Sequence, residues 1–360
     1  MTSIRWTKAL ILLSIAVALL FAVACGGDDE EEAAAPATTT TTTAPAAADT
    51  SGDAMMEEKP TLIFSDLDWP SAQLQNAIVR RILEDGYGYE TDAIFGGTVP
   101  MMEALRRGDT NITMEIWLPN QQEAFDEATS ENTIQVIGNS LEDNWQSAFV
   151  IPNYTAEANP GLRSVEDLKD PAHMELFITP DSKGKARLIN CIPGWECEGV
   201  NQTKLVTYGL TEHVELVNPG SDSALSAEIR SAFEQNEDVL FHYWGPTVLA
   251  HDLQTKLGGY TILEEPPYTD ECWAGDQGCE YPTAEVLIVI RTELAGQQDL
   301  VDLLTAWDFN AGNQLAVEGY MNETGEDFAA SADWFLRNTE EWKSWVTPEA
   351  LAKVEAALAG

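Results

Sequence analysis

Hydrophobic and polar positions alternate from residue 60 onward in a way that predicts strands and helices in turn. Apolar residues three and four apart at 71–85 predict an amphipathic helix that Gly86 closes, and a shorter predicted helix at 98–107 stops at Gly108. Short apolar runs predict strands at 61–69, 89–96 and 111–117. Strands and helices in this order predict an α/β lobe.

A second α/β series follows from residue 148. Apolar runs predict strands at 174–178, 214–217, 239–243 and 285–290, and amphipathic patterns predict helices at 200–208, 223–235, 300–320 and 328–358. A late buried strand followed by helices indicates that the chain returns to the first lobe. We therefore expect one lobe from 59–147 with 287–360 and a second lobe from 148–286. Two crossings would join them, with a ligand cleft between the lobes.

Residues 1–58 show a different pattern. Basic residues precede an apolar run at 9–23, which is short for a membrane-spanning helix and predicts a signal peptide at 1–24. The run ends in Ala-Val-Ala-Cys-Gly, which resembles a bacterial lipobox, although an ordinary Ala-x-Ala cleavage site is the alternative. Lipidation at Cys25 would place the protein on the outer face of the cell membrane or in the periplasm. Acidic, alanine and threonine residues dominate 25–58 and predict a disordered tether.

Charge and cysteine content narrow the classes of function. The chain has 19 basic and 60 acidic residues, a formal charge of −41, which argues against a nucleic-acid partner because phosphates attract Lys and Arg. The acidic excess indicates a solvated or salt-adapted surface, or one that favours cationic ligands. Four of the five cysteines form two local pairs, Cys191 with Cys197 and Cys272 with Cys279. Structural zinc sites favour closer spacing, so we expect disulfides and no metal site.

Motifs for catalysis are absent from the sequence. It contains no GxxxxGK[ST], HExxH, GxSxG or GxGxxG, and its four histidines have no metal-ligand spacing. His242 stands two residues before Trp244; we expect it in the core or at the surface, with ligand contact as the alternative. The sequence predicts neither an enzyme nor a cofactor.

Four tryptophans stand in loops that contain proline or glycine: Trp69, Trp117, Trp195 and Trp244. Three of them follow predicted strands, and in α/β lobes the loops after strand ends face the crevice. An aromatic box suits a methylated ammonium, which has no N–H groups to satisfy and meets the negative ring faces. Core packing is the alternative for each ring, and it is what we expect for Trp307, Trp334, Trp342 and Trp345 in the C-terminal helices.

The residues after Trp195 predict an anion site. Glu196, Cys197 and Glu198 precede a helix that we expect to open near Gly199, and unpaired backbone N–H groups at a helix N-terminus bind anions. A ligand with a methylated ammonium at one end and a carboxylate at the other fits both features, provided that the acidic side chains beside the loop point away.

Three segments resemble the glycine betaine/proline betaine-binding proteins of ABC transporters. They are CIPGWECEG at 191–199 with its flanks KGKARLIN and NQTKLVTYGL, GDTNITMEIWLP at 108–119, and VLFHYWGP at 239–246. The resemblance extends over 59–360. It implies an α/β, two-lobed type II periplasmic-binding-protein fold that closes on its ligand like a hinged trap.

The resemblance also implies roles for individual residues. Trp117, Trp195 and Trp244 match the family's tryptophan box, and Trp69 is similar in position to a cage aromatic of related choline and betaine binders. The pair Cys191–Cys197 matches the family's disulfide, and the backbone amides of Glu196 and Cys197 match its carboxylate site. Some members place a histidine shortly after the Trp117 motif, where this chain has Asn120 and Gln121. We expect Gln121 to contact the carboxylate instead.

These observations predict an exported solute-binding lipoprotein. It would capture glycine betaine and deliver it to an ABC permease with its ATPase. Choline, carnitine and proline betaine are alternative ligands, and a ligand-sensing receptor module is the alternative class.

Overall fold

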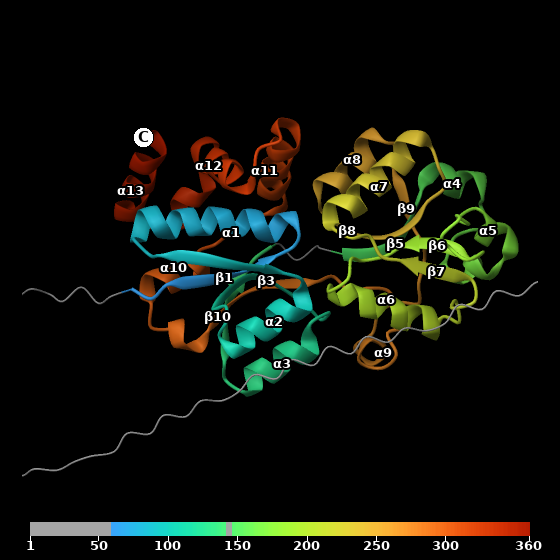
Figure 1. The fold of residues 1–360 in the computed structure, drawn as a ribbon, viewed down its shortest axis with the longest axis horizontal. Helices are drawn as coiled ribbons and strands as arrows, with labels where there is room; N and C mark the ends of the chain where they lie inside the picture. The colour runs from blue at the N-terminus through green and yellow to red at the C-terminus, as the bar shows by residue number, and fades with distance from the viewer. Residues whose placement is uncertain (1–58, 142–145) are drawn as a thin grey trace, which may run out of the picture. The chain divides into compact units, whose positions relative to one another are not determined.

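The computed structural model describes residues 59–141 and 146–360. The predicted signal peptide at 1–24, the predicted tether at 25–58 and Cys25 lie outside these residues. Among the helices described, none combines the length and the apolar character that crossing a membrane requires. Residues 57–360 form a single compact unit that holds two β-sheets (Figure 1).

The first sheet has five strands in the order β2-β1-β3-β10-β4. Strands β1 and β2 are parallel, β1 and β3 are parallel, and β10 runs antiparallel between β3 and β4. The late apolar strand therefore lies in the sheet built from the N-terminal strands. The bounds are β1 (Leu62–Leu67), β2 (Thr91–Gly96), β3 (Ile112–Leu118), β4 (Ile134–Asn139) and β10 (Glu285–Arg291).

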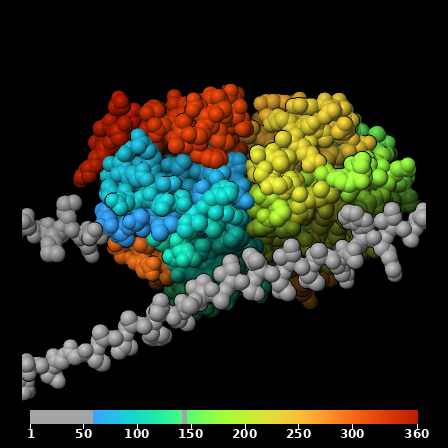
Figure 2. Space-filling model, in the orientation of Figure 1, coloured from blue at the N-terminus to red at the C-terminus, as the bar shows by residue number. Residues whose placement is uncertain are grey.

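Helices cover both faces of the first sheet. Figure 1 shows α1 with α11, α12 and α13 on one side, and α2 with α3 on the other. In Figure 2 the residues near the C-terminus, in red, lie beside the blue and cyan residues that follow residue 58, as the contact of α12 with α1 requires. The bounds are α1 (Pro70–Ile82), α2 (Thr98–Arg107), α3 (Gln122–Ser130), α10 (Gln298–Thr305), α11 (Ala311–Thr324), α12 (Phe328–Asn338) and α13 (Pro348–Ala359), with 3₁₀ turns at Thr292–Leu294 and Glu341–Ser344.

The second sheet has five strands in the order β7-β6-β8-β5-β9. Strands β6, β7 and β8 are parallel, and β5 runs antiparallel to β8 and β9. The strands are β5 (Gln146–Pro152), β6 (Ala186–Ile189), β7 (Val214–Val217), β8 (Leu240–Gly245) and β9 (Tyr260–Ile262). The helices are α4 (Asn153–Ala158), α5 (Pro171–Glu175), α6 (Glu196–Thr207), α7 (Asp222–Gln235), α8 (Val248–Lys256) and α9 (Asp270–Ala274), with a 3₁₀ turn at Val165–Lys169.

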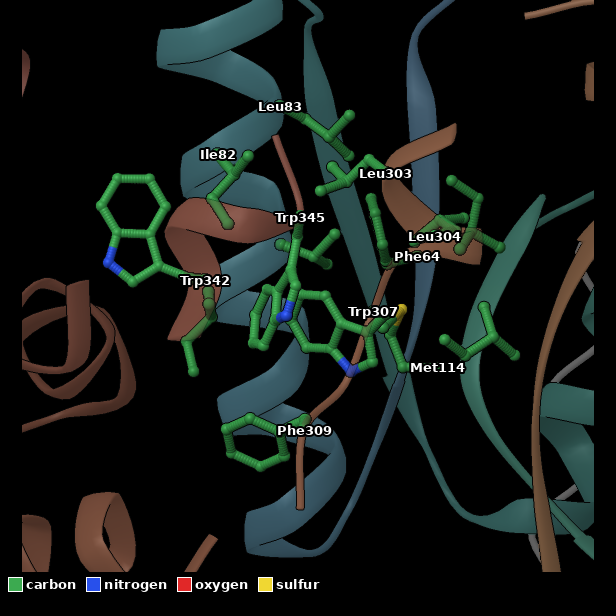
Figure 3. Close-up of a cluster of buried hydrophobic side chains, with 14 of the residues drawn as sticks. Phe64, Ile82, Leu83, Met114, Leu303, Leu304, Trp307, Phe309, Trp342 and Trp345 are labelled. Atoms are coloured by element: carbon green, nitrogen blue, oxygen red, sulfur yellow. The ribbon is translucent and has the colours of Figure 1, made fainter. Parts of the chain in front are cut away.

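The core of the first lobe contains three of the C-terminal tryptophans. Trp307, Trp342 and Trp345 are buried among the apolar side chains of α1, the sheet and α10 (Figure 3). Trp334 lies at the edge of this core, where its ring stacks on Tyr320 with centroids 4.5 Å apart. Core packing therefore accounts for these four rings, as their amphipathic surroundings predicted.

The predicted strand at 174–178 is wrong. Asp170 caps a short helix there by accepting the backbone N–H of Ala172, and Pro171 occupies the first helical position, so the chain forms α5 instead. The strand that pairs with β7 and β8 is β6, ten residues further on. Its four residues include Arg187, so the apolar run is too short to predict a strand.

Four predicted helices also differ in extent from those in the structure. Gly86 does not close the first helix, because a π-helical turn at Leu83–Tyr87 continues it to Gly88, which has a φ of 74°. Gly86 instead packs close to Val354 of α13. The two long helices expected at the C-terminus are each interrupted, the second before Pro348. Helix α6 begins at Glu196 instead of near Gly199, which matters for the site described next.

Candidate functional site

The loop from β6 to α6 presents Trp195 as a rigid aromatic surface. Cys191 and Cys197 are joined by a disulfide across the loop, and Gly194 adopts a φ of 97°, a conformation that favours glycine. Trp195 is the N-cap residue of α6, so the helix and the disulfide both restrict its backbone. The carbonyl of Gly194 accepts the backbone N–H of Val99 from the first lobe at 3.2 Å. The loop therefore spans the space between the lobes.

All seven ligand-contact residues predicted from the sequence line one cavity. They are Trp69, Trp117, Gln121, Trp195, Glu196, Cys197 and Trp244. Trp69 and Trp117 come from the first lobe, and Trp195 and Trp244 come from the second. The lining is completed by Thr98, Asn120 and Ser147, which were not predicted as ligand contacts, and by His242, for which ligand contact was the alternative. In the part of the chain that the structure describes, no lysine or arginine lines this cavity.

The rings around the cavity meet edge to face. The Trp195 ring lies 5.7 Å from that of Trp69 at 85° and 5.0 Å from that of Trp244 at 80°. Trp69 and Trp195 are each 6% exposed, whereas Trp117 and Trp244 are half-buried. Perpendicular rings turn their negative faces in different directions, and a ring face that lines a cavity can bind a cation.

Carboxylates accept hydrogen bonds from three of the four indole N–H groups. Glu115 accepts from Nε1 of Trp69 at 2.7 Å and from Nε1 of Trp117 at 2.9 Å. Asp68 accepts from Nε1 of Trp195, which is a bond between the lobes. Burial raises the pKa of both carboxyl groups, and the indole hydrogen bonds oppose that rise.

The N-terminus of α6 supplies hydrogen-bond donors at one end of the cavity. Glu196 and Cys197 occupy the first two helical positions, whose backbone N–H groups have no acceptor inside a helix. The N–H of Glu198 is used, because it donates to the carbonyl of Trp195 at 3.2 Å. The earlier start of the helix thus leaves two of the three amides considered from the sequence as donors.

The side chain of Gln121 is oriented by the backbone. Its Oε1 accepts the N–H of Trp117 at 2.7 Å, and the residue is 6% exposed. With the oxygen held in this way, the amide nitrogen is the group left to donate to a ligand.

The two acidic side chains beside the amides differ. Glu198 turns back over the loop, where its carboxylate accepts from Nδ2 of Asn218 at 2.5 Å and from the N–H of Gly194 at 3.3 Å. Glu196 lines the cavity, and burial followed by repulsion from Glu123 raises its pKa. Of the two acidic side chains, only Glu198 therefore turns away from the cavity, as the anion site requires.

His242 is part of both the core and the cavity lining. It is 1% exposed, its Nδ1 lies 3.1 Å from Sγ of Cys191, and burial lowers its pKa to about 3, so the ring is neutral. Its position two residues before Trp244 on β8 places both on the same face of the strand. Both cysteine sulfurs near it belong to the disulfide and offer no thiolate to a metal ion.

The second cysteine loop lies away from the cavity. Cys272 and Cys279 are joined by a disulfide, and the ring of Trp273 packs 5.4 Å from that of Tyr281 and 6.1 Å from that of Tyr268. Trp273 is therefore a packed ring of this loop, 7% exposed.

Sequence reasoning missed the two carboxylates behind the cage. Glu115 is the one charged residue in the β3 segment Ile-Thr-Met-Glu-Ile-Trp-Leu and is 1% exposed. A lone acid in an apolar strand is a signal of a buried polar network, although it does not reveal the partners. Asp68 stands beside Trp69 with no comparable signal.

Comparison with known proteins agrees with this geometry. Residues 60–338 match the family described as the substrate-binding domain of the ABC-type glycine betaine transport system. The glycine betaine/proline betaine-binding periplasmic protein of Escherichia coli is 27% identical over 300 residues, which cover 77% of this chain and 86% of that protein. The trimethylamine N-oxide-binding protein of Pelagibacter ubique is 26% identical over 228 residues, 62% of this chain and 68% of the relative.

Solved structures share the two-lobed fold. A choline-binding protein of an ABC transporter, in complex with choline, has a TM-score of 0.66 at 21% identity and covers 83% of this chain and 98% of its own. A glycine betaine/L-proline-binding protein from Borrelia burgdorferi has a TM-score of 0.65 at 19% identity and covers 82% of this chain and 100% of its own. The fold class predicted from the sequence is confirmed.

The family match extends over well over half of the sequence and confirms the resemblance on which the prediction rested. The chain therefore belongs to the family of substrate-binding domains of ABC-type glycine betaine transport systems, and it is a solute-binding protein of such a transporter and not an enzyme.

Proposed function

We propose that the protein captures glycine betaine in the tryptophan-lined cavity and delivers it to the permease of its transporter. The observation that supports this most directly is the convergence of Trp69, Trp117, Trp195 and Trp244 on one cavity. A desolvated cation–π contact contributes up to about 2 kcal/mol. Three or four such contacts supply much of the roughly 8 kcal/mol that micromolar binding requires.

The other end of the cavity suits the carboxylate of betaine. The first two N–H groups of α6 and the amide nitrogen of Gln121 are donors, and the positive end of the helix dipole favours an anion. The ligand would thus contact both lobes, because Gln121 and Trp117 belong to one lobe and α6 belongs to the other. Ligand binding closes the lobes, and the ligand is delivered without chemical change.

Choline is the strongest alternative ligand. The absence of lysine and arginine from the described lining, together with Glu196 among the lining residues, favours a ligand of net positive charge. The structural relative solved with choline has the same fold. Proline betaine, carnitine and trimethylamine N-oxide share the methylated ammonium or its oxide and compete on the same grounds.

Membrane attachment is a further part of the proposal. The lipobox-like segment at Cys25 supports a lipid anchor, and the tether at 25–58 would hold the folded residues 59–360 outside the membrane. Incorporation of labelled palmitate into the wild-type protein and its loss in Cys25→Ala would test this proposal.

Isothermal titration calorimetry of the purified protein with glycine betaine, choline and carnitine tests the ligand. We expect micromolar affinity for glycine betaine, with binding lost in Trp195→Ala. Binding of choline without betaine would move the ligand to the alternative. Failure of every methylated ammonium compound to bind would overturn the cage. Genes for a sensor kinase instead of a permease beside the coding sequence would favour a receptor module.

A further inference from the structure

Glu115 is a buried carboxylate that accepts several hydrogen bonds but has no cationic partner among the described residues. Its oxygens accept from the two indole nitrogens described above and from Nε2 of Gln75 at 2.8 Å. All three donors are neutral. Within 59–141 and 146–360, no lysine or arginine forms an ion pair with Glu115. A buried anion without a cation is costly, and such groups are usually paired in folded proteins.

The network around Glu115 leaves little freedom to its donors. Oε1 of Gln75 accepts from Nε1 of Trp307 at 2.8 Å and from Oγ of Ser140 at 2.9 Å, which fixes the amide so that its nitrogen faces Glu115. Burial raises the pKa of Glu115, and each of these donors opposes that rise because a protonated acid would need an acceptor for its own hydrogen.

The two indoles bound to Glu115 form part of the cavity wall. Because an indole N–H donates in the plane of its ring, the Glu115 carboxylate lies at the edges of the two rings, and a cation over either ring face would lie close to that edge. Buried charges at such distances interact more strongly than exposed ones, since water and salt screen them less. No lysine or arginine of the described lining competes for this interaction.

We propose, on the basis of the proposed function, that Glu115 is a specificity-determining residue that supplies the counter-charge for the ammonium group of the ligand. The carboxylate acts through Trp69 and Trp117, whose rings touch the ligand and whose N–H groups it binds. Ring contact alone accepts any group of the right shape. The charge at the edges of the rings selects a cation over a neutral group of equal size.

A neutral isostere separates charge from shape. In 3,3-dimethylbutanoate a carbon atom replaces the ammonium nitrogen of glycine betaine, while the three methyl groups and the carboxylate remain. Titration calorimetry of the purified protein with both compounds gives a ratio of affinities. Any general effect of a mutation on folding or lobe closure changes both affinities together, so the ratio reports the charge.

The test compares wild type with Glu115→Gln. We expect wild type to prefer glycine betaine and the variant to lose about tenfold to a hundredfold of that preference, mostly through weaker betaine binding. Glu318→Gln is the matched control, because Glu318 is also buried but accepts its bonds from Gln314 and from the backbone of Val248. The titrations are run at pH 9, above the Glu318 pKa of about 8, so that this variant also removes a charge. An unchanged ratio in Glu115→Gln, or an equal loss in both variants, would overturn the proposal.

A second variant covers the case in which Glu115→Gln does not fold. The double variant Gln75→Glu with Glu115→Gln keeps the number of donors and acceptors and moves the charge one residue away from the cage. Its affinity ratio should lie below that of wild type, and an unchanged ratio would contradict the proposal. If wild type binds neither compound nor any other methylated ammonium, the proposed function fails. If wild type binds betaine and the affinity ratio is the same in wild type and in the variants of residue 115, only this inference fails.

Discussion

Two groups of tryptophans in this protein differ in what holds their indole nitrogens. In the core of the first lobe, Nε1 of Trp307 donates to the amide oxygen of Gln75, and Nε1 of Trp342 donates to the carbonyl of Leu336 at 2.9 Å. In the cavity between the lobes, the acceptors are carboxylates. The same side chain is thus held by neutral groups where it only packs and by negative charges where it lines a cavity. We propose that these charges, more than the rings, suit the cavity to a cation.

Replacing a core tryptophan should have the largest effect, and it should act on stability. Trp342 is fully buried, so Trp342→Ala is expected to lower the free energy of unfolding by about 3 to 5 kcal/mol. The affinity of the folded fraction for ligand should stay within about twofold of wild type. Denaturant unfolding with and without ligand measures both quantities. A large loss of affinity at unchanged stability would erase the distinction between the two groups.

Replacing a cage tryptophan should mainly lower the affinity for ligand instead of the stability. Trp195→Ala removes a ring that contacts two others and is expected to weaken ligand binding by about a hundredfold or more. Trp195→Tyr keeps an aromatic face and should restore part of the affinity. Titration calorimetry with glycine betaine provides the measurement. Equal affinity of the alanine and tyrosine variants would show that the aromatic face is not what binds.

The acidic surroundings of the cage predict a dependence of stability on pH. Burial, with repulsion from Asp222 and Glu115, raises the pKa of Glu318 to about 8. The folded state therefore holds this proton more tightly than the unfolded state, and the stabilisation is complete below about pH 4.5 and is lost as the pH rises through 8. The loss is on the order of a few kcal/mol.

Glu318→Gln should flatten this dependence while keeping an acceptor for the N–H of Val248, which lies 3.0 Å away. Thermal unfolding between pH 5 and 9, without ligand, compares the variant with wild type. Parallel curves for the two proteins would assign the pH dependence to other groups, of which Asp222, with a pKa raised to about 7, is the first to examine.

The smallest predicted effect is on the affinity for the carboxylate end of the ligand, which Gln121 is expected to contact. Gln121→Glu keeps the oxygen that accepts from Trp117 and replaces the donor by an acceptor. Glycine betaine should bind about tenfold more weakly because the two carboxylates repel each other, and choline should bind equally well or better. Titration with both ligands measures the difference. An equal loss for both would place Gln121 among the structural residues.

Local sequence predicted the pieces of the site that depend on neighbours in the chain. A disulfide over six residues and a Pro-Gly turn restrict Trp195 whatever the rest of the fold does. Helix α2 also follows the prediction from end to end, because Gly108 provides the left-handed C-cap. Local signals failed at 174–178, where a short apolar stretch is compatible with a strand or a helix. Asp170 and Pro171 start a helix just before it, and the chain forms α5 there.

Tertiary structure decided which groups meet. Glu115 and Trp69 are 46 residues apart, and Asp68 and Trp195 are 127 residues apart, so no local pattern could pair them. The sequence by itself determined that four tryptophans stand in loops constrained by proline or glycine. Only the packing of two sheets, each with its own strand order, brings those loops to one cavity and sets carboxylates behind them. The reason is physical: hydrogen bonds and charges act over a few ångströms, and the distances between distant segments are set by topology.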